Sequence, residues 1–104
     1  MEEIKELTNT NFTIILGDGE EIKIIDFLIE NERCGWSLRE IISNTGVSLL
    51  IAKEILSKLN DLVIIEIKQP TPKKALYTIN KESEIVKHLI SLHKSIDKLL
   101  LNYY

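Results

Sequence analysis

The stretch WSLREIISNTGVS, residues 36–48, contains the signals that begin and end a short helix. Ser37 and Glu40 have the spacing of a capping box, in which the serine hydroxyl accepts a hydrogen bond from a first-turn amide and the glutamate carboxylate accepts one from the serine amide. Gly46 predicts the end of the helix, because the residue after a helix commonly adopts the left-handed conformation that glycine tolerates best.

A second amphipathic run begins at Ser48 and reaches Leu62. Ser48 is suited to cap this helix, since a serine side chain can satisfy a free amide of the first turn. Two helices joined by a glycine-containing turn form a helix-turn-helix, in which the second helix crosses the first and its outer face is free to enter a groove. The buried stripe of the second helix is predicted to contain Ile51 or Ala52, then Ile55, Leu56 and Leu59.

The hydrophobic pattern changes after the second helix. Residues 63–68 (VIIEIK) and residues 76–79 (LYTI) are rich in β-branched and aromatic side chains, which predicts two strands. Residues 69–75 (QPTPKKA) lie between them and contain two prolines, which exclude a central strand. The pattern therefore predicts a β-hairpin with an extended loop that carries Lys73 and Lys74.

The residues before the helix-turn-helix are less clearly patterned. Residues 2–10 indicate a short helical arm, and residues 12–16 are either a buried strand or the last turn of a helix, because periodicity cannot decide at this length. The breaker Gly17-Asp18-Gly19 follows. A helix is predicted from Glu20 to about Asn31, and one of its faces carries Ile22, Ile25, Leu28 and Ile29.

The C-terminal residues predict one long helix, from Lys81 or Glu82 to Asn102. A helix of roughly 20 residues is ~30 Å long and has more apolar surface than the small domain beside it can cover. We therefore expect its apolar seam to pair with a second copy of the chain; the alternative is that the helix folds back on its own domain. The seam follows a heptad spacing and consists of Ile85, Leu89, Leu92, Ile96, Leu99 and Tyr103.

Charge is unevenly distributed along the 104 residues. The net charge is −3 at pH 7, and residues 1–36 hold three basic and nine acidic side chains. Residues 37–80, by contrast, hold six basic and four acidic side chains. The helix-turn-helix and the hairpin thus lie in the basic part of the chain, which permits an anionic partner but does not demand one.

Few side chains suggest a metal or catalytic site. Metal ligands need clustered thiolates and imidazoles, whereas Cys34 stands alone and His88 and His93 are five residues apart, so that they do not share a helix face. We expect the histidines to be ordinary, partly exposed residues. The sequence contains no glycine-rich phosphate loop and no nucleophile motif. We therefore predict no catalytic residue, no bound metal, no cofactor and no enzymatic activity.

The cellular location follows from three further features. The single cysteine cannot form an intrachain disulfide, which fits a reducing compartment. The first residues, MEEIKE, are acidic and unlike a signal peptide, and no apolar stretch approaches the length of a membrane span. We expect a cytoplasmic protein with no membrane partner.

The order of these elements resembles that of the winged helix-turn-helix transcriptional regulators, and it looks closest to the small ArsR-like and MarR-like regulators, many of them archaeal. The resemblance covers roughly residues 14–80. ILGDGEEIKIIDFLIE looks like the opening helix of that family, and SLREIISNTGVS is similar to its motif xLxELAxxxGxS. IAKEILSKL resembles the core of the recognition helix, and LVIIEIK with ALYTIN resembles the wing.

This resemblance implies an α+β, mainly helical fold. A winged helix-turn-helix domain would occupy residues 1–80, with an N-terminal arm over residues 1–11, and a dimerisation helix would occupy residues 81–104. Such a regulator would bind double-stranded DNA as a two-fold homodimer, with half-sites ~34 Å apart. The side chains approaching base edges would be Ser48, Leu49, Leu50 and Lys53. Phosphate contacts would come from Arg39 and Lys58, and from Lys68, Lys73 and Lys74 on the wing.

Two other functions remain open. Leu49 and Leu50 occupy positions that tend to be polar in such regulators, and they would suit a winged helix that serves as a protein–protein interaction module without sequence-specific DNA binding. A regulator that responds to a small-molecule effector would need a pocket between the terminal helix and the core. The sequence cannot reveal such a pocket, so the effector is unknown.

Overall fold

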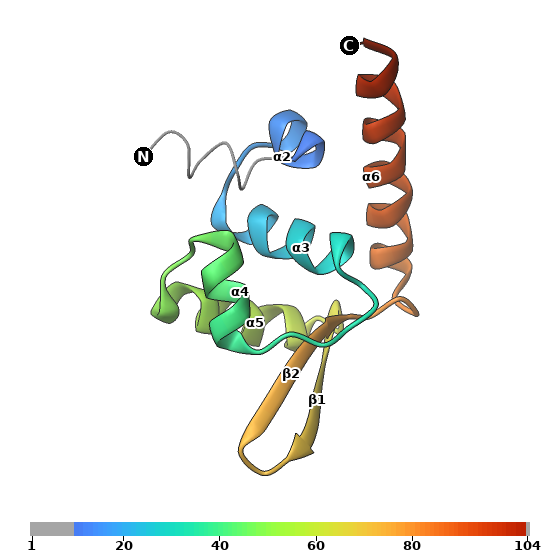
Figure 1. The fold of residues 1–104 in the computed structure, drawn as a ribbon. Coiled ribbons are helices and arrows are strands. Elements are labelled where there is room, and N and C mark those ends of the chain that lie inside the picture. Colours follow the sequence, from blue (N-terminus) through green and yellow to red (C-terminus); the bar gives the residue numbers. More distant parts are fainter. Residues whose placement is uncertain (1–9, 104) are drawn as a thin grey trace.

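The computed structural model describes residues 10–103, with side chains as far as residue 101. The predicted α+β, mainly helical class is confirmed (Figure 1). Nearly all of the expected N-terminal arm lies outside the described residues. Within them, the elements in chain order are α2 (Asn11–Leu16), α3 (Glu20–Glu30), α4 (Leu38–Thr45), α5 (Leu49–Asp61), β1 (Ile65–Thr71), β2 (Lys74–Ile79) and α6 (Glu84–Tyr103).

The run that periodicity left open between strand and helix forms the helix α2. Thr10 caps it: the Thr10 hydroxyl accepts a hydrogen bond from the Thr13 amide, and the Thr13 hydroxyl accepts one from the Thr10 amide. Phe12 is buried beneath α6, whereas Ile14 and Ile15 are exposed. A segment of six residues is too short to show a hydrophobic period. The capping hydrogen bonds of Thr10 instead stabilise the helical conformation.

The predicted helix-turn-helix is confirmed. The Ser37 amide donates to Glu40 Oε1 over 2.9 Å, and the Glu40 amide donates to Ser37 Oγ over 3.2 Å, which completes the capping box of α4. Gly46 ends this helix with a left-handed φ of 74°. Ser48 takes the cap position of α5, but among the described residues no backbone amide donates to its hydroxyl.

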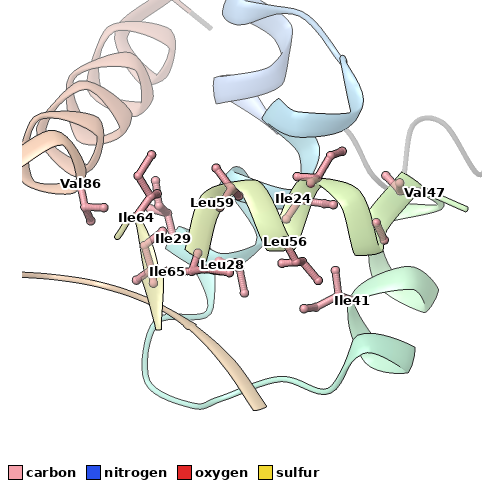
Figure 2. Packing of buried hydrophobic residues seen from close by; sticks show 13 residues of the cluster. Ile24, Leu28, Ile29, Ile41, Val47, Leu56, Leu59, Ile64, Ile65 and Val86 are labelled. Carbon is pink, nitrogen blue, oxygen red and sulfur yellow. The ribbon is translucent and has the colours of Figure 1, made fainter. Parts of the chain in front are cut away.

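One hydrophobic core joins these helices to the first turns of α6 and to the β-hairpin of β1 and β2, which we call the ribbon. Ile24 and Leu28 of α3 meet Leu56 of α5 at its centre, while Val47 and Val86 lie at its two ends (Figure 2). The predicted stripe of α5 is confirmed, since its buried residues are Ala52, Ile55, Leu56 and Leu59. Because this stripe is fully covered, the opposite face of α5 lies toward solvent.

The hairpin is confirmed, but its loop is shorter than expected. The strands pair antiparallel from Ile65 opposite Ile79 to Lys68 opposite Leu76, and after an irregularity Thr71 lies opposite Lys74. Residues 69–71 and 74–75 were expected in the loop and instead belong to the strands. A proline is tolerated here because a two-stranded ribbon has only edge strands.

A strained residue connects α5 to the ribbon. Val63 has a φ of 60°, the left-handed region that β-branched side chains rarely adopt. Hydrogen bonds fix this conformation: the Val63 amide donates to Asn60 O over 3.0 Å, and Asn80 Nδ2 donates to Val63 O over 2.8 Å. The turn at Val63 delays the first strand, which was expected to begin there and begins at Ile65.

Helix α6 begins two or three residues later than expected and stands beside α2 and α3 (Figure 1). Its inner face packs on the rest of the chain through Val86, His93, Ile96 and Leu100, all of them buried. Ile96 and Leu100 form a small second cluster with Phe12. The helix therefore folds back on its own domain along one face.

Candidate functional site

The side chains proposed to read DNA lie on the outward face of α5. Leu49 and Leu50 are 53% and 69% exposed, and Ser48 and Lys53 are exposed as well. Because Ser48 does not use its hydroxyl to cap the helix, this group can serve as donor or acceptor for a partner. The start of α5 thus presents a hydroxyl, two leucines and one cation to solvent.

A groove of about 580 Å³ lies mainly between α4 and the ribbon, and Leu49 at the start of α5 also lines it. Arg39 of α4 lines it together with Lys73 and Lys74, and its apolar lining includes Ile42 and Leu49. The structure thereby brings three predicted phosphate-binding residues around one depression. Groups 34 positions apart in the sequence become neighbours only because β2 returns beside the helix-turn-helix.

The predicted phosphate-binding cations differ in whether they already form ion pairs. Lys68 and Lys73 are exposed and make no ion pair with any described residue. Lys58 instead pairs with Glu21 of α3, with 2.8 Å between Nζ and Oε2, and this contact lowers the pKa of Glu21. The hydrogen bonds that Glu40 makes with Ser37 lower the pKa of its carboxyl, and nearby Lys74 contributes to this shift. Lys58 would have to break its pair to bind phosphate.

The predicted dimer seam divides between two faces of α6. Ile96 is buried against Phe12 in the same chain, and Leu89 is half-buried between the two clusters. Ile85, Leu92 and Leu99 are exposed and lie seven residues apart, so they share one outer face. The side chain of Tyr103 lies outside the described residues.

A second group of polar residues lies between α3 and α6, and the sequence analysis missed it. The expectation of partly exposed histidines is wrong for His93, which is 5% exposed, whereas His88 is exposed. His93 Nε2 lies 2.8 Å from Asp26 Oδ1 and 3.3 Å from Glu30 Oε1, and Nδ1 lies 3.4 Å from Asp97 Oδ2. We call these four residues the histidine cluster.

Neighbouring residues hold the histidine cluster in place. The Thr10 hydroxyl donates to Asp26 Oδ2 over 2.9 Å, and the Phe12 ring stacks on the His93 ring with centroids 4.8 Å apart. Burial raises the pKa of Glu30; His93 opposes this shift, and the carboxylates of Asp26 and Asp97 add to it. The sequence carried one signal for the cluster: Asp26 with Glu30, and His93 with Asp97, are each four apart on a helix.

A cavity of about 540 Å³ opens beside the histidine cluster. Its lining includes Glu30, His93 and Asp97 from the histidine cluster, together with Cys34 and Trp36. A pocket between the terminal helix and the core, which the sequence could not reveal, is therefore present.

None of the helices within residues 10–103 is long and apolar enough to cross a membrane.

Sequence comparisons find no relatives for this chain: no protein-family model matches it, and no curated protein is significantly similar. Solved structures do resemble it. One is the homodimeric winged helix-turn-helix DNA-binding domain of Mb0332 from Mycobacterium bovis, a possible ArsR-family transcriptional regulator. That match has 21% identity and a TM-score of 0.60, and covers 90% of this chain and 82% of the other.

Two further structures are similar over most of the chain. MepR, a transcription regulator of the Staphylococcus aureus multidrug efflux pump MepA, is 12% identical with a TM-score of 0.63, covering 99% of this chain and 77% of MepR. A mutant of ZitR from Lactococcus lactis is 16% identical with a TM-score of 0.59, covering 78% of this chain and 55% of ZitR. The chain therefore has the winged helix-turn-helix fold, as its resemblance to ArsR-like and MarR-like regulators implied.

Proposed function

We propose that this protein is a DNA-binding transcriptional regulator that acts as a two-fold dimer. The observation that carries the proposal is the groove between α4 and the ribbon, where Arg39, Lys73 and Lys74 lie together with Leu49 from the exposed start of α5. Phosphate groups bind such convergent cations, and a helix of this exposure fits the major groove. The same arrangement of elements occurs in a MepR mutant bound to an oligodeoxyribonucleotide, which is 11% identical with a TM-score of 0.61.

Each part of the interface would have a different task. Helix α5 would enter the major groove, where Ser48 and Lys53 would approach base edges and the leucines would contact thymine methyl groups. Lys68 and the two lysines near the tip of the ribbon would bind the adjacent backbone or minor groove, which positions the protein without specifying sequence. Lys58 would contribute less, because it already pairs with Glu21.

The dimer would form through the outer face of α6. Ile85, Leu92 and Leu99 are exposed, and burying such side chains contributes roughly 1.5–3 kcal/mol each. Ile14 and Ile15 of α2, which packs beside α6, add further exposed apolar surface. An exposed patch of this kind is typical of an interface between proteins.

Binding of a labelled DNA duplex, followed by fluorescence anisotropy at several salt concentrations, tests this function. The wild type should bind at low salt and lose affinity steeply as salt rises, because bound phosphates release counterions. Replacing both Lys73 and Lys74 with alanine should weaken binding to all sequences alike and lower the salt slope by roughly one unit for each lost contact. A matched control with Lys87→Ala and Lys98→Ala makes the same change in net charge on α6 and should keep the wild-type slope.

A protein–protein interaction module is the second candidate function. Leu49 and Leu50 are exposed at the start of α5, where a DNA partner would be mostly polar. Two exposed leucines at this position favour a protein partner. A module of this kind would show no salt-dependent binding of DNA in the anisotropy experiment. Equal salt slopes for the wild type and the Lys73/Lys74 double variant would contradict the proposed role of the ribbon.

A further inference from the structure

We propose that the histidine cluster is a binding site for a first-row divalent cation, with His93 Nε2, Asp26 Oδ1 and Glu30 Oε1 as ligands. One ligand atom from each of the three residues lies within 4.8 Å of the ligand atoms of the other two. Zinc–ligand distances are about 2.0–2.2 Å, so two ligands of a tetrahedral ion lie roughly 3.4 Å apart. The separations of 2.8 Å and 3.3 Å from His93 Nε2 need shifts of less than about 1 Å to reach this value.

The surroundings of His93 match those of a metal-binding histidine. Such a residue usually donates its other ring N–H to a carboxylate, which fixes the ring and makes the ligand nitrogen more basic. Asp97 Oδ2 occupies this position at 3.4 Å from Nδ1. The Thr10 hydroxyl donates to the second oxygen of Asp26 and leaves Oδ1 directed at His93, so the outer shell orients two of the three ligands.

The carboxylates around His93 favour a bound cation. Both ring nitrogens of His93 face carboxylate oxygens, but a neutral imidazole has only one N–H to donate. Among the described residues, no lysine or arginine forms an ion pair with Asp26, Glu30 or Asp97. Asp26 and His93 are each about 95% buried, where an unbalanced charge is costly. A divalent ion would balance the two carboxylate ligands directly.

The ligand set and the access route indicate the kind of ion. One imidazole and two carboxylates suit Zn²⁺ or Mn²⁺ better than a soft ion such as Cu⁺, which prefers thiolates. The cavity lined by Glu30, His93 and Asp97 gives an ion a path from solvent and leaves room for water as a fourth ligand. An ion here would join α3 to α6 and hold the terminal helix on the winged helix.

Thermal unfolding of the full chain tests the site, after treatment with a chelator and then with added ZnCl₂ or MnCl₂. An ion that binds only the folded state should raise the melting temperature by on the order of 10 °C when its free concentration is about 100 times its Kd. Glu30→Gln and His93→Gln should abolish this rise. Glu20→Gln removes a carboxylate from the same helix at an exposed position and should retain it.

Cobalt absorption provides a second measurement that does not depend on stability. Co²⁺ held by one nitrogen and two carboxylate oxygens should give visible d–d bands in the wild type and in Glu20→Gln, but not in Glu30→Gln. The Glu30 side chain is exposed (44%), so this variant should fold even where a change at the buried His93 does not. An intense thiolate charge-transfer band would instead assign the ion to Cys34, which lines the same cavity, and would overturn the proposal.

Two other outcomes also contradict the site. If neither Zn²⁺ nor Mn²⁺ changes the melting temperature at millimolar concentration, the histidine cluster is not a metal site. If Glu30→Gln and the wild type gain the same stability from the ion, the ion binds elsewhere on the chain. Neither outcome bears on the anisotropy experiment, so the metal site and the DNA-binding function can fail separately.

Discussion

The imidazole of His93 lies 2.8 Å from the carboxylate of Asp26, although 67 positions separate the two residues in the chain. This contact joins the middle of α6 to α3, the first helix of the winged helix. Together with the packing of Ile96 on Phe12, it places one face of α6 against its own domain. The outer face, which carries Leu92 and Leu99, stays exposed.

The first prediction concerns the pH dependence of stability in the presence of a chelator. The pKa of Glu30 is raised in the folded state by burial and by Asp26 and Asp97. The folded state therefore binds a proton more tightly than the unfolded chain, and the carboxyl destabilises the fold as pH rises above about 4.5. Glu30→Gln should unfold at a higher temperature than the wild type at pH 7 and at a similar one at pH 4.

Differential scanning calorimetry at both pH values checks this prediction. The Glu20→Gln control changes an exposed carboxylate of the same helix. The difference in melting temperature between this variant and the wild type should therefore not grow with pH. A wild type that is more stable than Glu30→Gln at pH 7 without metal would mean that the Glu30 charge stabilises the fold.

The second prediction compares the two serines that begin the helices of the helix-turn-helix. Ser37 accepts a hydrogen bond from the Glu40 amide, so Ser37→Ala should lower the free energy of unfolding by about 1 kcal/mol. Ser48 makes no such bond with the described residues, and Ser48→Ala should cost clearly less. Urea denaturation measures both, and equal losses would contradict the difference between the caps.

The third prediction concerns the left-handed residue before the ribbon. The left-handed conformation costs roughly 1–2 kcal/mol for a residue with a side chain, while the extra backbone entropy of glycine costs roughly 0.5–1 kcal/mol. Val63→Gly should therefore raise the free energy of unfolding by up to about 1.5 kcal/mol. Leu62, with a φ of −85° and similar exposure, provides the control.

Leu62→Gly should lower stability, since glycine raises the backbone entropy of the unfolded chain and there is no strain at this position to relieve. Chemical denaturation of the two variants side by side separates these effects. If both glycine variants are destabilised equally, the conformation of Val63 stores no strain.

The fourth prediction tests the dimer. Replacing Leu92 and Leu99 together with lysine should yield a monomer in analytical ultracentrifugation, because the charges would face each other across the interface. Both side chains are exposed within the chain, so the helical circular dichroism should remain. Ile96 is unsuitable for this test, since it is buried in its own fold. Ser91→Lys adds a charge on another face of α6 and should remain a dimer; an unchanged mass for the double variant would exclude this interface.

The sequence by itself determined the local elements. The capping box of Ser37, the left-handed Gly46 and the buried stripe of α5 depend on neighbours within four residues, and all three are present as predicted. The ribbon was predicted for the same reason, although the tight turn at its tip and the strained Val63 were not. The conformation of Val63 depends on a hydrogen bond from Asn80, 17 positions away, which no local pattern contains.

Only the tertiary structure decided which surfaces are free. The heptad pattern of α6 predicted a single seam, but packing against Phe12 and His93 divides it into an inner and an outer face. The histidine cluster likewise requires residues 67 positions apart to meet, and the groove between α4 and the ribbon requires residues 34 positions apart to meet. The hydrophobic period of a helix predicts which of its faces is apolar. It does not predict which residues pack on that face, because those residues come from elsewhere in the chain.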